Sequence, residues 1–99
     1  MYGTIARLRI QPGRESEMVE HLNQYGATQV PGFVASAFYR ADQGGDTYWL
    51  AVVFESKESY QANADSPEQD ARYRELRGLL AADPEWHDGE VLLRQTAPS

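Results

Sequence analysis

The segment from Tyr48 to Phe54 is apolar on both of its faces, and this feature constrains the fold more than any other. Its sequence, Tyr-Trp-Leu-Ala-Val-Val-Phe, has the aromatic and β-branched composition that strands favour. Successive side chains of a strand point to opposite sides of the sheet. A strand that is apolar on both sides must be covered twice, so helices over one face leave a second face that needs its own cover.

Further strands are predicted on either side of this segment. Residues 2–10 alternate, with Arg7 and Arg9 on one face and the following residues on the other: Tyr2, Thr4, Ala6, Leu8 and Ile10. Strand-like runs over residues 33–40 and 47–54 flank a polar loop over residues 41–46, a pattern that predicts a β-hairpin. A last short strand is expected over residues 90–94.

Three helices are predicted between these strands. Apolar residues at helical spacing predict the first helix from Arg14 to Tyr25, with Gly26 as its C-terminal stop; they are Met18, Val19, Leu22 and Tyr25. Ser56 can cap a short second helix that runs through about Asn63.

The third helix has the strongest start signal in the sequence. Ser66 stands at the N-cap, Pro67 at the first helical position, and Gln69 at the position that closes a capping box. The helix is expected to end at Asp83-Pro84 and to present one apolar stripe: Tyr73, Leu76, Leu79 and Leu80.

This order, βαββαβ, predicts an α+β domain of ferredoxin-like topology, with a four-stranded antiparallel sheet and helices on one face only. The domain is expected to span residues 1–95, followed by a frayed tail over 96–99. The uncovered face carries Trp49, Ala51 and Val53, and a small domain buries only roughly 60–70% of its unfolded surface. We therefore expect a homodimer, in which Arg7 and Arg9 meet acidic residues of the second copy.

The charge and composition exclude several classes of partner. Fifteen acidic residues against nine Lys and Arg give a net charge of −6, which disfavours nucleic acid and anionic membrane surfaces. The sequence has neither an apolar run of about eighteen residues nor a secretory leader, so we expect a cytoplasmic protein with no membrane span. The absence of cysteine excludes disulfides, thiol catalysis and cysteine-ligated clusters.

Four stretches resemble the antibiotic biosynthesis monooxygenase (ABM) family, and the resemblance covers roughly residues 2 to 93. They are Tyr2-Gly3-Thr4-Ile5-Ala6-Arg7-Leu8 with Gln11-Pro12-Gly13, Val30-Pro31-Gly32-Phe33, Phe54-Glu55-Ser56-Lys57-Glu58-Ser59-Tyr60, and Ala64-Asp65-Ser66-Pro67. The resemblance implies a dimeric α/β barrel, with a cavity between sheet and helices in each protomer. It leaves the activity open, because the family includes quinone-forming cofactor-independent oxygenases, haem-degrading oxygenases and members of unknown activity.

The haem-degrading members are the poorer match. They use an Asn on the first strand, a Trp on the second helical segment and an axial His, and this sequence has Ala6, Asn63 and Tyr73 at the matching positions. Without the His the iron has no nitrogen ligand, although Tyr73 could in principle coordinate ferric iron.

The quinone-forming members match in part. They use an Asn and a Trp on the third strand, a Tyr soon after and an Arg on the last helix. The equivalents are Leu50, Phe54, Tyr60, and either Arg74 or Arg77. Tyr60 matches the pattern, whereas Leu50 and Phe54 keep the shape and lose the hydrogen-bond donors.

Tyr60 and Tyr73 are the candidate catalytic residues, because a tyrosine on the roof of the cavity can hold a substrate oxygen or move a proton. Each can equally be an amphipathic core residue with a wet hydroxyl. The candidate substrate-binding residues are Leu50, Phe54, Asn63, Leu76, His21 and Arg74. His21 could instead flank the helix, and no metal is expected at His87, which we place in a turn without recognisable ligand spacing.

Two functions of different class remain. The first is a monooxygenase that oxidises a small, apolar, aromatic or polyketide-like molecule without flavin, haem or metal. The alternative is a non-enzymatic small-ligand-binding or stress-associated domain that keeps the fold without the chemistry.

Overall fold

The computed structural model describes residues 1–27, 29–43 and 45–98, which form four strands and three helices. Gly44 of the predicted loop and Ser99 of the predicted tail lie outside this range. The strands are β1 (Tyr2–Arg9), β2 (Phe33–Arg40), β3 (Thr47–Phe54) and β4 (Glu85–Glu90), and the helices are α1 (Glu15–Ala27), α2 (Lys57–Ala64) and α3 (Pro67–Arg77). The order along the chain confirms the ferredoxin-like prediction, with the second helical segment divided into α2 and α3.

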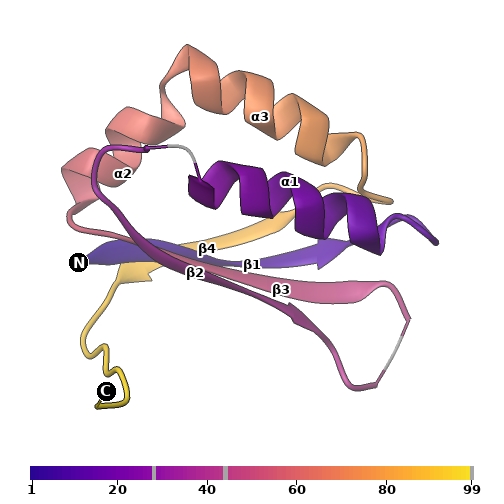
Figure 1. Cartoon of the computed structure of the whole chain (residues 1–99), viewed down its shortest axis with the longest axis horizontal. Coiled ribbons are helices and arrows are strands. Elements are labelled where there is room, and N and C mark those ends of the chain that lie inside the picture. Colours follow the sequence, from indigo (N-terminus) through magenta and orange to yellow (C-terminus); the bar gives the residue numbers. More distant parts are fainter. Residues whose placement is uncertain (28, 44, 99) are drawn as a thin grey trace.

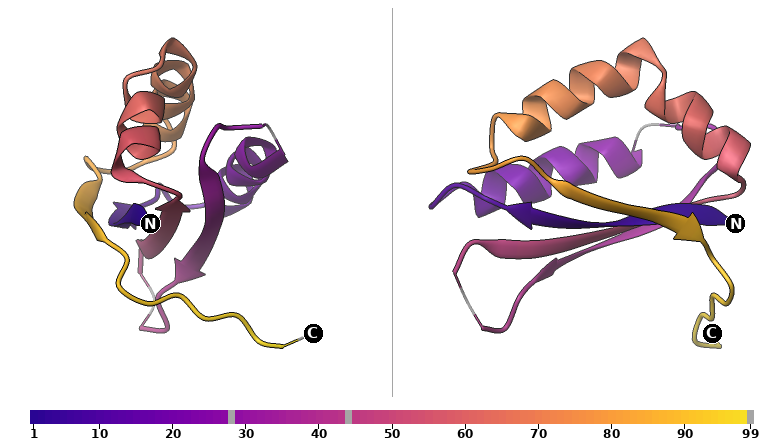
Figure 2. Two further views of the ribbon diagram at one scale, coloured as in Figure 1. Left: turned by 90° about the vertical axis from the view of Figure 1, so that its left-hand side faces the viewer. Right: turned by 180° about the vertical axis from the view of Figure 1, so that it is seen from behind.

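The strands form one antiparallel sheet in the order β2-β3-β1-β4. The two central strands, β1 and β3, pair along their whole length, from Tyr2 opposite Phe54 to Arg9 opposite Thr47. All three helices lie on the same side of this sheet (Figure 1), and the end-on view in Figure 2 shows the opposite face without a helix. None of the helices in the described residues is long and apolar enough to cross a membrane.

The core lies between the sheet and the helices, where the even-numbered residues of β1 point inward. The buried residues of this core are Ala6, Leu8, Ile10, Met18, Tyr48, Leu50, Leu76, Leu79 and Leu80. Val19, predicted to belong to the apolar stripe of α1, is instead 51% exposed. Successive residues of a helix lie about 100° apart, so Val19 points away when Met18 faces the sheet.

Capping explains where α2 and α3 begin. The Ser56 hydroxyl accepts from the Ser59 backbone N–H at 3.0 Å, and the Ser59 hydroxyl accepts from the Ser56 N–H in return. Ser66 caps α3 in the same way, accepting from the Gln69 N–H at 3.1 Å. The Gln69 side chain does not follow the capping-box prediction, because it accepts a hydrogen bond from Asn63 instead.

Two helix ends differ from the predictions. Gly26 lies inside α1, which continues to Ala27. The third helix ends at Arg77 with Gly78 as its cap, well before Asp83-Pro84. Leu79 and Leu80 leave the helix because their backbone joins the end of β1: the Leu79 carbonyl accepts from Gln11, and Leu80 forms a bridge with Ile10.

The last strand is also placed wrongly by the prediction of residues 90–94. Strand β4 begins at Glu85 and includes His87, which the sequence analysis assigned to a turn. The pairing of β4 with β1 ends at Glu90, which lies opposite Tyr2, the first residue of β1. The chain after Glu90 therefore has no residue of β1 opposite it. Leu92 is accordingly 92% exposed, and the segment after β4 runs to the side of the sheet opposite the helices (Figure 1).

The helix-free face of the sheet carries an apolar group centred on β3, as the two-sided pattern of this strand predicts, with charged residues of β1 and β4 beside it. Ile5, Tyr39 and Trp49 are exposed there, next to the half-buried Ala51 and Val53. We call these five residues the outer sheet face.

The two arginines of β1 have acidic partners within the same chain. Arg7 lies 3.6 Å from Glu85, and Arg9 lies 3.0 Å from Asp46. Antiparallel pairing explains these contacts, because it sets Arg7 opposite Glu85 and brings Arg9 to the start of β3. Contacts of the two arginines with acidic residues of a second copy stay a prediction.

Candidate functional site

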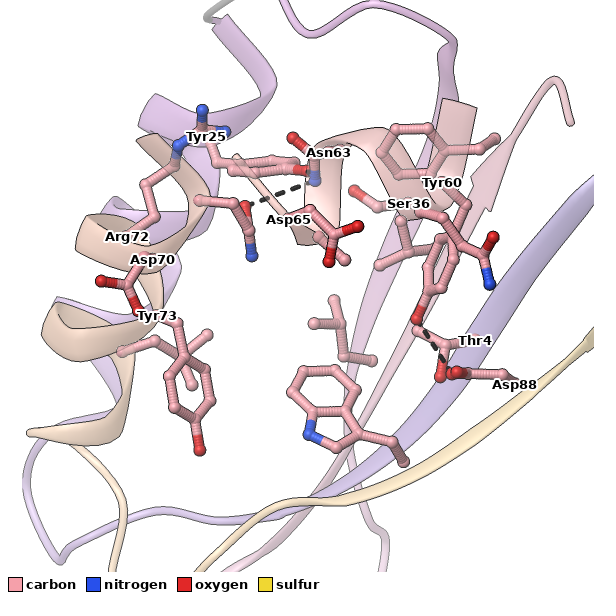
Figure 3. A pocket seen from close by; sticks show the side chains of 18 of the residues that line it. Thr4, Tyr25, Ser36, Tyr60, Asn63, Asp65, Asp70, Arg72, Tyr73 and Asp88 are labelled. Atoms are coloured by element: carbon pink, nitrogen blue, oxygen red, sulfur yellow. Dashed lines mark hydrogen bonds between the residues drawn. The ribbon is translucent and has the colours of Figure 1, made fainter. Parts of the chain in front are cut away.

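A cavity of about 680 Å³ lies between the inner face of the sheet and the three helices (Figure 3). This volume is within the usual range for sites that hold small organic molecules. The side chains that line it come from all four strands and all three helices of the described residues.

The sheet supplies the apolar floor of the cavity. Leu50, Val52 and Phe54 alternate along β3 and point to the helix side. Leu50 and Phe54 are almost fully buried, which leaves no polar side-chain atom on this part of the wall. Both were predicted to contact substrate, and both line the cavity.

The helices supply the roof and most of its polar groups. His21 and Tyr25 come from α1, Tyr60 and Asn63 from α2, and Tyr73 and Leu76 from α3. The structure therefore brings seven of the eight predicted site residues to one cavity: Leu50, Phe54, Tyr60, Asn63, Tyr73, Leu76 and His21.

Arg74 is the exception, because it does not line the cavity. Its guanidinium is exposed and pairs with Asp70 one helical turn earlier, while Arg77 pairs with Asp83. The arginine of α3 that does line the cavity is Arg72. The structure therefore places Arg72 at the cavity, and not the predicted Arg74.

Tyr60 and Asp88 form a hydrogen-bonded pair at one end of the cavity (Figure 3). The Tyr60 hydroxyl donates to Oδ1 of Asp88 at 2.9 Å. Burial, followed by this bond and the charge of Asp88, raises the pKa of Tyr60 to about 12. The hydroxyl therefore stays protonated at neutral pH, and its hydrogen is directed to Asp88.

Aromatic contacts fix the ring of Tyr60. Tyr2 and Phe54 pack against it edge to face, with ring centroids 5.2 and 5.6 Å away. Thr4 lies beside the pair (Figure 3); it is only 6% exposed, and its side-chain contact with Tyr60 partly opposes the rise in the Tyr60 pKa.

A second polar group lies under the ends of α1 and α2. The Asn63 amide donates to the Tyr25 hydroxyl at 3.2 Å and to Gln69 at 3.4 Å. The Arg72 guanidinium lies 4.8 Å from the centre of the Tyr25 ring. Burial raises the pKa of Tyr25, and its contacts with Asn63 and Arg72 partly oppose the shift.

Tyr73 and His21 lie away from both groups. No hydrogen bond to the Tyr73 hydroxyl is found within the described part of the chain, and the Tyr73 ring is 6.5 Å from that of Trp86. The side chain of His21 is only 12% exposed, and its Nδ1 lies 3.5 Å from Glu75. Tyr73 therefore offers a free hydroxyl, whereas the hydrogen of Tyr60 is already engaged.

Three of the wall residues that the sequence analysis did not name as site residues come from the β1–β4 pair: Thr4, Trp86 and Asp88. The last two lie on β4, which was predicted too late in the chain. Register explains their placement, because Thr4 pairs with Asp88 and Ala6 with Trp86, and the even residues of β1 face inward. The signal that could have found them is the alternation of Trp86 and Asp88 with Glu85 and His87.

The charged side chains that line the cavity are mainly acidic. They are three aspartates, Asp65, Asp70 and Asp88, and one arginine, Arg72. The residues that the structure describes contain no group of three or more His, Asp or Glu side chains placed to hold a metal.

Comparison with known families gives one match. The model of the ABM family, antibiotic biosynthesis monooxygenase, matches residues 1–75. No curated protein matches the chain significantly.

Solved structures share the whole fold. A candidate antibiotic biosynthesis monooxygenase from Chloroflexus aurantiacus is 27% identical over 96% of both chains, with a TM-score of 0.77. A second candidate from Bordetella bronchiseptica is 21% identical over 93% of this chain and 97% of its own, with a TM-score of 0.78. SnoaB, a cofactor-independent oxygenase from Streptomyces nogalater, is 19% identical over 99% of this chain and 97% of its own, with a TM-score of 0.78. At such identities the last two support the fold alone.

Proposed function

This chain belongs to the antibiotic biosynthesis monooxygenase family, and on that premise we propose that it is a cofactor-independent monooxygenase. Its proposed substrate is a small, apolar, aromatic or polyketide-like molecule. The observation that carries the proposal is the cavity itself: apolar β3 residues form its floor, and the Tyr60–Asp88 pair lies at one end. The proposal takes its reaction class from SnoaB, a cofactor-independent oxygenase with the same fold.

The proposed reaction converts an activated CH₂ group and O₂ to a carbonyl group and water. Loss of a proton from the substrate leaves a carbanion that is stabilised by the aromatic system. This carbanion reacts with O₂ to form a carbon–oxygen bond, and protonation gives a hydroperoxide. Loss of water then breaks the oxygen–oxygen bond and leaves the carbonyl, so one oxygen atom enters the product and the other leaves as water.

The residues of the cavity wall have different proposed roles in this reaction. Leu50, Phe54 and Leu76 enclose the rings and exclude water, which keeps the carbanion from being reprotonated by solvent. The free hydroxyl of Tyr73 donates to a substrate oxygen and so stabilises the charge that develops there. His21, a largely buried side chain on the cavity wall, is the proposed proton acceptor.

A second candidate function is non-enzymatic binding of the same kind of molecule. The observation that favours it is that Leu50 and Phe54 stand where the quinone-forming members have hydrogen-bond donors, while the Tyr60 hydrogen is already bound to Asp88. A cavity with few free donors can hold an apolar ligand without activating it.

The deciding experiment is oxygen uptake with a panel of anthrone-like phenols. The wild-type protein is expected to consume O₂ and to form the quinone in equal amounts, without added flavin, hemin or metal. Tyr73→Phe should lower the rate by ~10²-fold if its hydroxyl stabilises developing charge. Tyr39→Phe is the matched control, because it removes a hydroxyl from the outer sheet face. Ligand binding without oxygen uptake across the panel would favour the binding function.

A further inference from the structure

Tyr25 and Tyr60 both line the cavity, but their hydroxyl groups are bonded in opposite ways. The Tyr60 hydroxyl donates its hydrogen to Asp88 at 2.9 Å. The Tyr25 hydroxyl instead accepts a hydrogen from the Asn63 amide at 3.2 Å. A tyrosine has one hydroxyl hydrogen to donate. That of Tyr60 is used within the protein, whereas no acceptor for that of Tyr25 is found among the described residues.

The polar neighbours of Tyr25 are hydrogen-bond donors. The Arg72 guanidinium lies 4.8 Å from the centre of the Tyr25 ring, and the Asn63 amide reaches the hydroxyl oxygen. Burial raises the pKa of Tyr25, and the contacts with Asn63 and Arg72 act to lower it, as donors to a hydroxyl oxygen do. The balance keeps Tyr25 protonated at neutral pH, so its hydrogen remains available to a ligand.

The position of Tyr25 suits contact with a ligand in the cavity. Figure 3 shows Tyr25, Asn63 and Arg72 together at one end, away from the Tyr60–Asp88 pair. The Tyr25 ring also packs edge to face on Phe33, with ring centroids 5.7 Å apart, so its direction is fixed from two sides. A hydroxyl held in this way, with donors on its oxygen, is a preorganised and polarised hydrogen-bond donor.

We propose that the Tyr25 hydroxyl binds an ionised ring hydroxyl of an aromatic ligand, with Asn63 and Arg72 as its positioning residues. The phenolate oxygen of the ligand accepts the hydrogen of Tyr25, and the positive charge of Arg72 favours the anion. The inference rests on the proposed function in that the same cavity holds the substrate, and it specifies that this substrate carries an acidic hydroxyl group. Tyr73 lies apart from Tyr25, so a substrate held by both has two oxygen groups.

Arg72 supplies the positive charge at this end of the cavity. Arg74 on the same helix pairs with Asp70, and this pair also offsets the charge of that aspartate. No ion pair of this kind is found for Arg72 in the part of the chain that the structure describes. The charge of Arg72 is therefore free to act on a ligand bound at Tyr25.

The remaining aspartates of the lining have less effect at Tyr25. Asp88 is bonded to Tyr60 at the other end of the cavity, and Asp65 is exposed to solvent, which screens its charge. The charge that shifts the pKa of Tyr25 is that of Arg72, and not that of an aspartate. The local field at the hydroxyl therefore favours an anion although the lining as a whole is acidic.

4-Nitrophenol tests the subsite, because its phenol and phenolate forms differ in their absorption spectra. Bound to the wild-type protein, it should ionise at a pH about one unit below that of the free compound, which is a tenfold preference for the phenolate. 4-Nitroanisole cannot ionise and measures the affinity of the cavity for the neutral ring. Ionisation of the bound compound at the pH of the free compound, or above it, would overturn the subsite.

Tyr25→Phe assigns this shift to the hydroxyl. The variant keeps the ring, so it should restore the ionisation of the free compound and leave the affinity for 4-nitroanisole unchanged. Tyr39→Phe is the matched control, because it removes a hydroxyl from the outer sheet face and should keep the wild-type shift. A full shift in Tyr25→Phe would overturn the subsite, and loss of the shift in His21→Asn alone would assign the anion to His21 instead.

Asn63→Leu and Arg72→Gln test the positioning residues by the same spectroscopic shift, with folding checked by circular dichroism. Each should reduce the shift, since the first removes a donor to the Tyr25 oxygen and the second removes the charge. Arg77→Gln removes the same charge from α3 but does not line the cavity, so it should keep the wild-type shift. A full shift in both Asn63→Leu and Arg72→Gln would contradict their roles.

The subsite and the oxygenase can fail separately. 4-Nitrophenol has no CH₂ group to oxidise, so its binding does not depend on the reaction. Oxygen uptake by a protein that leaves the ionisation of 4-nitrophenol unshifted would overturn the subsite and leave the oxygenase. A shift that depends on Tyr25, without oxygen uptake on the anthrone panel, would support the subsite and leave the binding function.

Discussion

The Tyr60 hydroxyl on α2 and the Asp88 carboxylate on β4 are joined by a hydrogen bond of 2.9 Å, although 28 residues separate them in the sequence. The bond connects the roof of the cavity to an edge strand whose residues are all exposed, Asp88 included. It also decides the chemistry of Tyr60, because a hydroxyl that donates to a carboxylate cannot donate the same hydrogen to a ligand.

The raised pKa of Tyr60 predicts a loss of stability at alkaline pH. Its pKa is about 12 in the folded protein and about 10 in the unfolded chain. The unfolded chain therefore releases this proton first, so the stabilisation is complete below pH 10 and is lost as the pH rises toward 12. Urea unfolding of wild type and Tyr60→Phe is measured from about pH 8 to about pH 12, a range chosen around these pKa values. The free energy of unfolding should fall less in the variant than in the wild type. Parallel curves for the two proteins would refute the assignment.

Glu15 predicts the opposite dependence at acid pH. Arg40 and Tyr48 both donate to its carboxylate, and these bonds lower its pKa from 4.5 to about 2. The stabilisation is therefore present above pH 4.5 and is lost as the pH falls from 4.5 toward 2. Glu15→Gln should flatten the acid side of the stability curve.

Glu17→Gln is the matched control for this measurement. Glu17 lies in the same first turn of α1 and pairs with Arg14 at the surface. It should leave the acid dependence of the unfolding free energy close to that of the wild type. An equal effect of both variants would mean that net charge, and not the Arg40–Tyr48 contact, sets the dependence.

Thr4→Val is expected to stabilise the protein. Valine has nearly the shape of threonine and removes a buried hydroxyl that contacts Tyr60 without a hydrogen bond of good geometry, so the free energy of unfolding should rise by about 1 kcal/mol. Thr4→Ser is the companion variant: it keeps the hydroxyl, loses a buried methyl group and should destabilise by roughly 1 kcal/mol. Chemical denaturation measures both, and a marked destabilisation by Val would mean that the hydroxyl is bonded within the protein.

The outer sheet face predicts self-association. Trp49, 37% exposed, and the half-buried Val53 lie on it. Val53→Asp should give monomer or unfolded chain, because a buried unpaired charge is costly. Trp49→Ala should weaken association by about 2 kcal/mol or more if this side chain anchors the interface.

Sedimentation at micromolar concentration measures this association. Ala71→Asp is the control, since it adds the same charge at an exposed position of α3. A wild-type protein that sediments as a stable folded monomer would show that the outer sheet face does not mediate a dimer.

The sequence by itself determined the elements whose signals are local. The bounds of β2 and β3 agree with the predictions, because both are strand-like runs that flank a polar loop. Ser56 and Ser66 fixed the starts of α2 and α3, since a cap acts within three or four residues of its own position. The two-sided apolarity of β3 also predicted a cover of helices on one face and an uncovered apolar surface on the other.

Only the tertiary structure decided where β4 lies and what it brings to the cavity. Its residues are polar and exposed, so their strand conformation depends on pairing with β1, and the start of β1 at Tyr2 sets where that pairing stops. The same register sets Asp88 opposite Thr4 and within reach of Tyr60, and the register of α3 directs Arg72 inward and Arg74 to solvent. Contacts between residues far apart in sequence depend on how strands pair and helices rotate, and the alternation within residues 85–88 does not specify a pairing register.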